Sequence, residues 1–212
     1  MSAPIVLVAD DHPMFREALR LAVGRAVPAA VIVEAGQLSE AADIARTADR
    51  LDLILLDLRM PGAEGFSGVA LLHAERPTTP ILVVSSADHP DIVSRAQAYG
   101  AVGFLPKTAR LEDIEAAILA ALAGERPAPP PAADTDPTTG DMARRIATLT
   151  PAELRVLVGV LAGRLNKQIA HDLGIAETTV KGHMTIIMRK LNVGNRTQVV
   201  LAARALDIAL EG

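Results

Sequence analysis

The stretch LDLILLDLRMPG occupies residues 51–62 and carries the strongest indication of the fold. Its apolar run, 53–56, is short and has no polar residue at alternate positions. A run of this kind predicts a parallel strand that is buried on both faces. The run ends on Asp57, which we therefore expect at the carboxyl end of its strand, where open α/β sheets gather their functional groups.

Three further apolar runs also end on polar residues. They are 5–9 before Asp10 and Asp11, 81–84 before Ser85, and 102–106 before Lys107. Any one of these polar residues alone is explained equally well as a helix cap, a turn residue or a solvated charge. Their shared position at strand ends favours one common site at one edge of a sheet.

The first 123 residues alternate strand and helix patterns five times. The predicted strands are 5–9, 31–35, 53–57, 81–85 and 102–106. The predicted helices are about 13–26, one that starts from Ser39 as N-cap, 66–76, 90–99 and 110–123. This alternation predicts an α/β, flavodoxin-like (βα)5 domain, with a parallel five-stranded sheet in the order 2-1-3-4-5 and helices on both faces.

Composition and charge divide the chain into three parts, which we predict at 1–123, 124–147 and 148–212. Residues 1–124 carry 10 Lys/Arg and 16 Asp/Glu, whereas residues 148–212 carry 8 and 5. The middle part holds five prolines among alanines, which predicts a semi-extended Pro/Ala-rich linker without a core of its own. A basic excess of this size suits a polyanionic partner but is also ordinary for a protein surface.

The last part has helical patterns throughout, which predicts an all-α, four-helix domain. Thr150, Pro151 and Glu153 form a capping box with proline at the first helical position. Asn166 is placed to cap a short helix, and a longer helix over 177–191 follows after a three-residue turn with glycine. A fourth helix opens near Asn195. Two helices joined in this way are typical of a helix-turn-helix.

The residues at the strand ends suggest phosphoryl chemistry. Three carboxylates about 4 Å apart repel by roughly 4 kcal/mol per pair at an effective dielectric constant of about 20, so a cation is expected among them. Mg²⁺ suits one or two carboxylates together with phosphate oxygens. Asp57 would then be the nucleophile, Asp10 and Asp11 metal ligands, Lys107 the counter-ion and Ser85 the sensor of the phosphoryl group.

Residues 1–123 resemble the receiver domain of bacterial response regulators in the stretches VADDHPMFREAL, LILLDLRMPG, ILVVSSAD and GAVGFLPK. The resemblance implies that a sensor histidine kinase phosphorylates Asp57. It also implies that Ser85 moves onto the phosphoryl group and that Phe104 swings inward behind it. The implied ligands of Mg²⁺ are the side chains of Asp10, Asp11 and Asp57 and the backbone carbonyl of Arg59. Ser86 departs from the alanine that this family most often has there.

Two other functions remain open at this point. Aspartyl-phosphate phosphatases also use an aspartate at a strand end with Mg²⁺, but they place a second aspartate two residues later as the general acid. That position is Arg59, which cannot serve, so we do not expect an enzyme. The second alternative is a DNA-binding regulator that acts without phosphorylation and uses a receiver-like domain for dimerisation.

The predicted helix 177–191 has two contrasting faces. One face is apolar and consists of Val180, Met184, Ile187, Met188 and Leu191. The other face is small or basic and consists of Thr178, Lys181, Gly182, Thr185 and Arg189. Such a face can approach a DNA backbone closely, although periodicity alone fits a solvated amphipathic helix as well.

The stretches LTPAELRVL, NKQIAHDLGIAETTVKGHMTIIMRKL and NRTQVV resemble the LuxR-type DNA-binding domain. The resemblance implies that the helix from Glu177 is the recognition helix, although Ala176 replaces the usual N-cap serine. The residues that would face bases are Lys181, Gly182 and Thr185. Those that would contact the DNA backbone are Thr179, His183, Lys190 and Arg196. The residues that would pair two chains are Val199, Val200, Ala203 and Leu206.

Together the two resemblances imply a two-component transcription regulator of the NarL/FixJ type. The implied partners are a sensor histidine kinase, a two-fold site in double-stranded DNA, a second copy of the chain and RNA polymerase. We expect a cytoplasmic location, because no run reaches the ~18 apolar residues of a membrane span and the chain starts without a secretory signal. The absence of cysteine excludes disulfides and thiolate chemistry.

Overall fold

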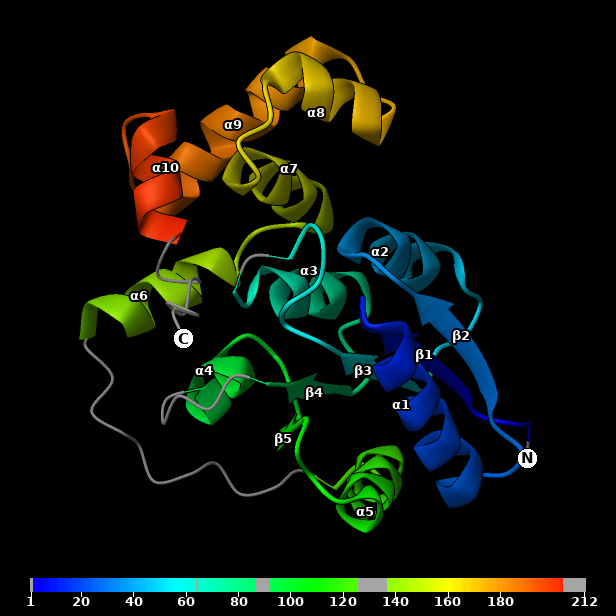
Figure 1. Cartoon of the computed structure of the whole chain (residues 1–212). Helices are drawn as coiled ribbons and strands as arrows, with labels where there is room; N and C mark the ends of the chain where they lie inside the picture. The colour runs from blue at the N-terminus through cyan, green and yellow to red at the C-terminus, as the bar shows by residue number, and fades with distance from the viewer. Residues whose placement is uncertain (1, 64, 87–91, 126–136, 204–212) are drawn as a thin grey trace.

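The structure, a computed structural model, describes residues 2–63, 65–86, 92–125 and 137–203 (Figure 1). The strands are β1 Ile5–Ala9, β2 Val31–Ala35, β3 Leu53–Leu56, β4 Ile81–Ser85 and β5 Gly103–Pro106. The helices that follow them in turn are α1 Pro13–Ala26, α2 Leu38–Thr47, α3 Ser67–Glu75, α4 Ile92–Ala98 and α5 Leu111–Leu122. The predicted alternation of strand and helix is confirmed.

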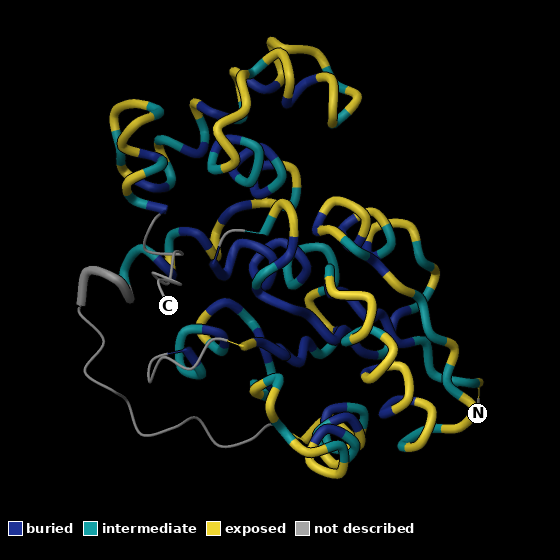
Figure 2. The backbone as a smooth tube through the Cα atoms, viewed as in Figure 1, coloured by how far each residue is buried: buried dark blue, intermediate teal, exposed yellow. Residues whose placement is uncertain are grey.

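The strands form one parallel sheet in the order β2-β1-β3-β4-β5, as predicted. Alternate side chains of each strand enter two different cores. Leu7, Ile54 and Val83 pack with residues of α2, α3 and α4, whereas Val8 and Leu55 pack with residues of α1 and α5. Because helices cover both faces, the central strands β1, β3 and β4 are buried over nearly their whole length and need no polar alternation, whereas the edge strands β2 and β5 are partly exposed (Figure 2).

Helix α2 begins two residues earlier than a cap at Ser39 would place it, because its N-cap is Gln37. Ser39 lies inside the helix, and Gln37 is the residue before it. The side chain of Glu40 reaches back to accept a hydrogen bond from the N–H of Gly36 at 2.8 Å. Leu38 is buried at the first helical position. The start of α2 is therefore set by this carboxylate and by apolar burial, and the serine hydroxyl has no part in it.

The C-terminal part contains α7 Pro151–Leu161, α8 Asn166–Leu173, α9 Glu177–Leu191 and α10 Arg196–Ala203. The capping box at the start of α7 is confirmed, with the Thr150 hydroxyl and the Glu153 carboxylate each accepting from the other's N–H. Gly174 adopts the left-handed conformation, φ 64°, that ends α8 and turns the chain into α9. The helix-turn-helix is confirmed, although Asn166 is the first residue of α8 and Leu165 precedes it as N-cap.

The predicted extended linker is wrong in its second half, which forms helix α6 Pro137–Ile146. Ile146 is fully buried and Ala143 is nearly so, and both belong to the same apolar cluster as residues of α7 and α9. Proline is tolerated in the first turn of a helix, so Pro137 marks the start of α6 and does not prevent it. Residues 126–136 of the predicted linker lie outside the described part. No helix in the described ranges is long and apolar enough to cross a bilayer.

Candidate functional site

The register of the sheet explains why the polar strand ends meet. Ala9 pairs with Leu56, so Asp10 and Asp57 follow from adjacent strands at the same level. The N–H of Asp57 donates to the carbonyl of Ala9 at 2.8 Å. On the other side of β3, the N–H of Lys107 donates to the carbonyl of Ser85 at 2.9 Å. The four strands therefore deliver these side chains to one edge.

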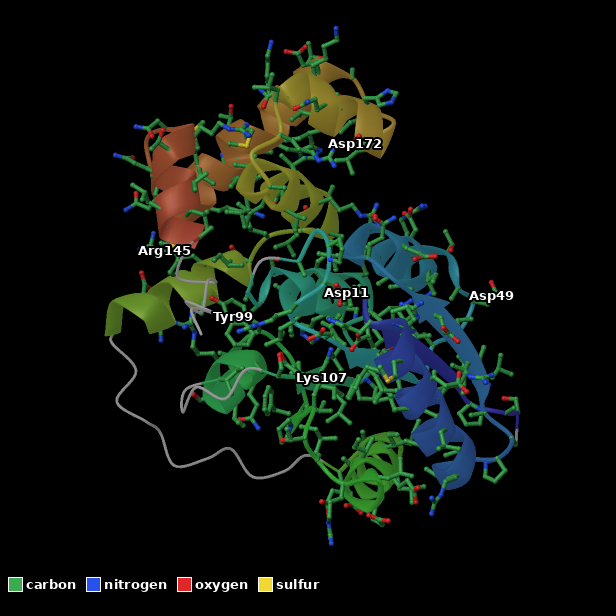
Figure 3. The ribbon with its side chains drawn as sticks, in the orientation of Figure 1. Asp11, Asp49, Tyr99, Lys107, Arg145 and Asp172 are labelled. Atoms are coloured by element: carbon green, nitrogen blue, oxygen red, sulfur yellow. The ribbon has the colours of Figure 1, made fainter. Side chains whose placement is uncertain are left out.

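Lys107 is the centre of the cluster. Its Nζ lies 2.7 Å from Asp10 Oδ2 and 2.7 Å from Asp57 Oδ2, and both carboxylates are almost fully buried. The same ammonium lies 4.6 Å from the centroid of the Phe15 ring, a cation–π arrangement that covers it from one side. Figure 3 labels Lys107 and, ahead of α1, Asp11. One cation thus compensates two buried anions.

The electrostatics of the two partners follow from this burial. Burial raises the pKa of Asp57, against the opposing effect of its hydrogen bonds from Lys107 and from the N–H of Arg59. Burial alone would lower the pKa of Lys107, but its bonds to Asp10 and Asp57 outweigh it and raise the pKa. The Asp57 carboxylate is consequently held in a site that disfavours its charge.

The remaining acidic residue completes a possible cation site. Asp10, Asp11, His12 and Asp57 each offer one ligand atom, and these atoms all lie within 4.8 Å of one another. Carboxylate oxygens at this density fit a hard divalent ion such as Mg²⁺. From the sequence, His12 was a possible metal ligand that looked like an ordinary loop residue; in the structure its Nδ1 lies 2.6 Å from Asp11 Oδ1. Its only signal was its position directly after the acidic pair.

The other predicted residues of this site lie around the cluster. The N–H of Arg59 donates to Asp57 Oδ1 at 3.1 Å, so the main chain of Arg59 passes beside the phosphoacceptor candidate. Ser85 is fully buried at the end of β4. Phe104, on β5, is half-buried and packs against the apolar cluster on the α4 side of the sheet. Ser86 is exposed.

The second candidate site is the outer face of α9. Val180, Met184, Ile187 and Leu191 are buried and Met188 is half-buried, as predicted for the inner face. The exposed residues of α9 include the whole predicted outer face, namely Thr178, Lys181, Gly182, Thr185 and Arg189, and Thr179 is exposed beside them. A Cβ added to Gly182 would meet nothing within 4 Å. The outer face therefore carries two exposed cations, Lys181 and Arg189, and is open to a large partner at Gly182.

Two residues predicted to contact the DNA backbone have partners within the protein. The ammonium of Lys190 lies 2.7 Å from Glu153 Oε2 and donates to the carbonyl of Thr148 at 2.9 Å. The guanidinium of Arg196 donates to Asn166 Oδ1 at 3.1 Å and to the carbonyl of Arg164. These bonds position Lys190 and Arg196 within the helical part, and their contact with the DNA backbone stays a prediction. His183 stays half-buried on α9.

The predicted pairing residues need a correction. Val199 is fully buried and Ala203 is 1% exposed within a single chain, so neither is available to a second copy. Both fill the space between α10 and the neighbouring helices. The exposed apolar residue of α10 is Leu201, at 58%. Leu206 lies outside the described residues.

Comparison with protein families supports both parts of the chain. Residues 6–119 match the family described as response regulator receiver domain. Residues 147–203 match the family described as bacterial regulatory proteins, luxR family. The fold and these matches define the class, which is the DNA-binding transcription regulators of two-component systems.

Individual relatives agree over nearly the whole chain. The glycerol metabolism activator of Pseudomonas putida is 40% identical over 211 residues, 95% of this chain and 96% of that protein. The nitrate/nitrite response regulator protein NarL of Escherichia coli (strain K12) is 33% identical over 201 residues, 92% and 93% of the two chains. The signal receiver domain of the putative response regulator NarL from Mycobacterium tuberculosis is a solved structure with 34% identity and a TM-score of 0.53, covering 59% of this chain and 100% of its own. The chain belongs to the response regulators that carry a LuxR-type DNA-binding domain.

Proposed function

We propose that Asp57 accepts a phosphoryl group from a sensor histidine kinase and that this modification controls how the chain binds double-stranded DNA. The observation that carries the proposal is Lys107, whose ammonium bridges Asp10 and Asp57. A transferred phosphoryl group would add negative charge at the point where this cation is already positioned.

The transfer itself uses groups of this chain at defined atoms. An Asp57 carboxylate oxygen forms the new bond to phosphorus while the bond from phosphorus to the donor's histidine nitrogen breaks, and the histidine leaves. Asp10, Asp11 and Asp57 would hold Mg²⁺, with the carbonyl of Arg59 as a further ligand. When bound, the ion neutralises charge on the phosphoryl oxygens. Lys107 pairs with a phosphoryl oxygen, and the Ser85 hydroxyl donates to another.

Readout takes place in the C-terminal part, for which we propose the bounds 148–212, after a receiver at 1–123. The outer face of α9 enters the major groove, with Lys181, Gly182 and Thr185 toward the bases. Thr178, Thr179, His183 and Arg189 would lie toward the DNA backbone. Two chains would bind a two-fold site as a symmetric pair. Contact with RNA polymerase would then convert binding into a change of transcription.

A conformational switch would link phosphorylation of Asp57 to DNA binding by α9. The Ser85 hydroxyl moves toward the phosphoryl group and Phe104 fills the space behind it, which changes the surface near β4 and β5. We propose that the changed surface favours pairing of two chains. A regulator that ignores phosphorylation would lack this step.

The test compares the wild type with Asp57→Asn on a duplex selected by the wild-type chain from random DNA. Binding is measured with and without acetyl phosphate and Mg²⁺. We expect the phosphodonor to increase affinity or dimerisation of the wild type and to leave Asp57→Asn unchanged. An equal increase in both proteins would contradict the assignment of Asp57. High affinity in both proteins without any response would favour the phosphorylation-independent alternative.

A further inference from the structure

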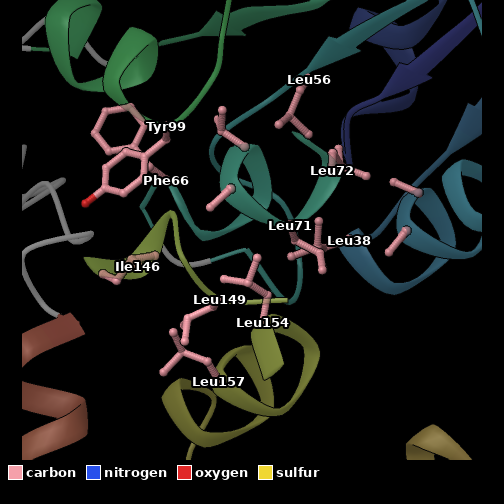
Figure 4. Packing of buried hydrophobic residues seen from close by; sticks show 14 of the residues in the cluster. Leu38, Leu56, Phe66, Leu71, Leu72, Tyr99, Ile146, Leu149, Leu154 and Leu157 are labelled. Atoms are coloured by element: carbon pink, nitrogen blue, oxygen red, sulfur yellow. The ribbon is translucent and has the colours of Figure 1, made fainter. Parts of the chain in front are cut away.

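The two parts of the chain share an apolar contact. Leu71 of α3 and Leu38 of α2 belong to the same buried cluster as Leu149 and Leu154, which lie just before and within α7. Each of these four side chains is at most 4% exposed. Figure 4 shows Leu38 and Leu71 facing Leu149 and Leu154 across the boundary. The helical part is thus docked on the receiver by way of α7.

A sheltered ion pair fixes the orientation of this contact. Arg155 Nη2 of α7 lies 2.7 Å from Glu75 Oε1 at the end of α3. The Glu75 side chain is 7% exposed and the Arg155 side chain 21%. An ion sheltered to this degree is costly without its partner, so sliding or rotating α7 against α3 is disfavoured. The pair makes the docking specific in a way that leucine contacts alone do not.

The recognition helix α9 lies on the side of α7 that faces away from the receiver. Helix α7 packs against α3 with one side and against α8 and α9 with others, so it separates α9 from the receiver (Figure 1). Lys181, Gly182 and Thr185 are exposed while α3 and α7 are in contact. The same conformation therefore combines a docked helical part with an open DNA-reading face.

We propose that the receiver holds its helical part through the α3–α7 contact without covering the recognition helix, so that the docked chain reads DNA as it stands. The inference rests on the proposed role of α9 in DNA binding. It places the control by phosphorylation in the pairing of two chains, and it excludes release of a masked helix as the controlled step.

A covalent lock tests this directly, because the chain contains no cysteine that could interfere. In the full chain, Glu75→Cys/Arg155→Cys is joined by a bismaleimide across the interface. We expect an intramolecular cross-link in dilute solution and an affinity for the selected duplex within about twofold of the uncross-linked variant. Arg110→Cys/Asp113→Cys is the matched control, since this exposed pair lies wholly within the receiver.

Charge reversal provides an independent measure of docking. Glu75→Arg should open the chain, seen as a larger radius of gyration in small-angle scattering, and Glu75→Arg/Arg155→Glu should close it again. Without a phosphodonor, the wild type, Glu75→Arg and Glu75→Arg/Arg155→Glu should bind the duplex with affinities that agree within about twofold. A rise of about tenfold in Glu75→Arg would show that docking masks α9 and would overturn the inference.

The remaining outcomes are also decisive. Loss of DNA binding only on cross-linking overturns the inference and leaves the proposed function standing. Failure of the cross-link to form, together with an unchanged radius for Glu75→Arg, overturns the docking itself. A wild-type chain that binds no duplex, with or without a phosphodonor, contradicts the proposed function, and the inference fails with it.

Discussion

At the scale of single residues, Asp57 and Lys107 show how burial prepares the site for chemistry. The sheet buries the Asp57 carboxylate and so raises its pKa, while Lys107 supplies the one ammonium that bridges it to Asp10. The ionised carboxylate that a nucleophile requires is therefore favoured by the hydrogen bonds from Lys107 and from the N–H of Arg59. A phosphoryl group on Asp57 would place its negative charge beside the same Lys107 ammonium. Within the cluster, Lys107 is therefore the residue that responds directly to phosphorylation.

Gly182 gives a prediction about the DNA-facing surface. Glycine inside a helix costs about 1 kcal/mol relative to alanine, and a methyl group at Gly182 would meet nothing within 4 Å. We expect Gly182→Ala to raise the free energy of unfolding by about 0.5–1 kcal/mol, measured by urea denaturation. We also expect it to weaken DNA binding at least about fivefold, because the added methyl group lies between the helix and the duplex.

Gly24 is the matched control for this substitution. It lies in α1, is exposed, and also has nothing within 4 Å of an added Cβ. Gly24→Ala should bring a comparable gain of stability and leave DNA affinity unchanged. Equal DNA affinities of Gly182→Ala and the wild type would show that α9 does not need a glycine at position 182 to approach the duplex.

Tyr99 gives a prediction about pH. Burial raises the pKa of Tyr99 to about 12 from its ordinary value of 10.0. The folded state therefore favours the neutral phenol, and the stability that this adds is complete below pH 10 and is lost as the pH rises toward 12. Since the chain has one tyrosine and no tryptophan, the ultraviolet absorbance of phenolate reports this residue alone. A native midpoint near that of the urea-unfolded chain would contradict the burial of Tyr99.

At the scale of elements, α9 carries two lysines with different tasks. Lys190 joins α9 to the start of α7 through Glu153, whose pKa burial would raise but the Lys190 hydrogen bond lowers. Lys181 is 62% exposed, and its ion-pair partner among the described residues is Glu177, one turn before it. One lysine therefore holds the helix in the domain, and the other is free for a partner.

The different environments of Lys190 and Lys181 predict that replacing the first affects stability and replacing the second affects DNA binding. Lys190→Met should lower the free energy of unfolding by about 2 kcal/mol, because it leaves the nearly buried Glu153 without its cation. Lys181→Met should change stability by less than about 0.5 kcal/mol but reduce the preference for the selected duplex over unselected DNA by about 1–3 kcal/mol, because it removes a base contact. Urea denaturation and DNA titrations with selected and unselected duplexes measure the two effects. The reverse pattern would place Lys190, and not Lys181, at the bases.

The elements that the sequence could predict are those with local signals. The strands and their order followed from apolar runs that end on polar residues, and the start of α7 followed from Thr150, Pro151 and Glu153. Helix α6 was missed because Pro137 and its proline-rich surroundings resemble an extended segment, whereas the burial of Ile146 depends on distant helices. A local sequence pattern does not show that helices distant in sequence bury Ile146 and so stabilise α6.

The same limit applies to the candidate sites. Convergence of Asp10, Asp57 and Lys107 was predictable because parallel strands end at one edge. The partner of Lys190, in contrast, lies 37 residues away, and nothing in the spacing indicates it. Val199 was expected at a dimer contact from the resemblance to the LuxR-type domain, but the resemblance does not show whether its side chain is covered within the chain.

At the scale of the whole molecule, an apolar cluster and the sheltered ion pair between Glu75 and Arg155 join the two parts within the described residues. The contact between α3 and α7 connects the receiver with the helical part, while the reading face of α9 stays exposed. The architecture combines mechanical connection with an open DNA interface. Communication between Asp57 and DNA would then pass through the pairing of two docked chains.

This connection predicts the cooperativity of unfolding. We expect the wild type to unfold in a single calorimetric transition, because α3 and α7 share buried surface. Glu75→Arg places two cations where an ion pair was, so the receiver and the helical part should separate into two transitions, and Glu75→Arg/Arg155→Glu should recover one. Two transitions already in the wild type would mean that the contact is too weak to couple the parts.

The mass of the intact chain after incubation with acetyl phosphate and Mg²⁺ tests the central claim most directly. The account predicts that the wild type gains the mass of one phosphoryl group, that hydroxylamine removes it as expected for an acyl phosphate, and that Asp57→Asn gains nothing. A phosphoryl group that Asp57→Asn still acquires, or a wild type that acquires none, would contradict it.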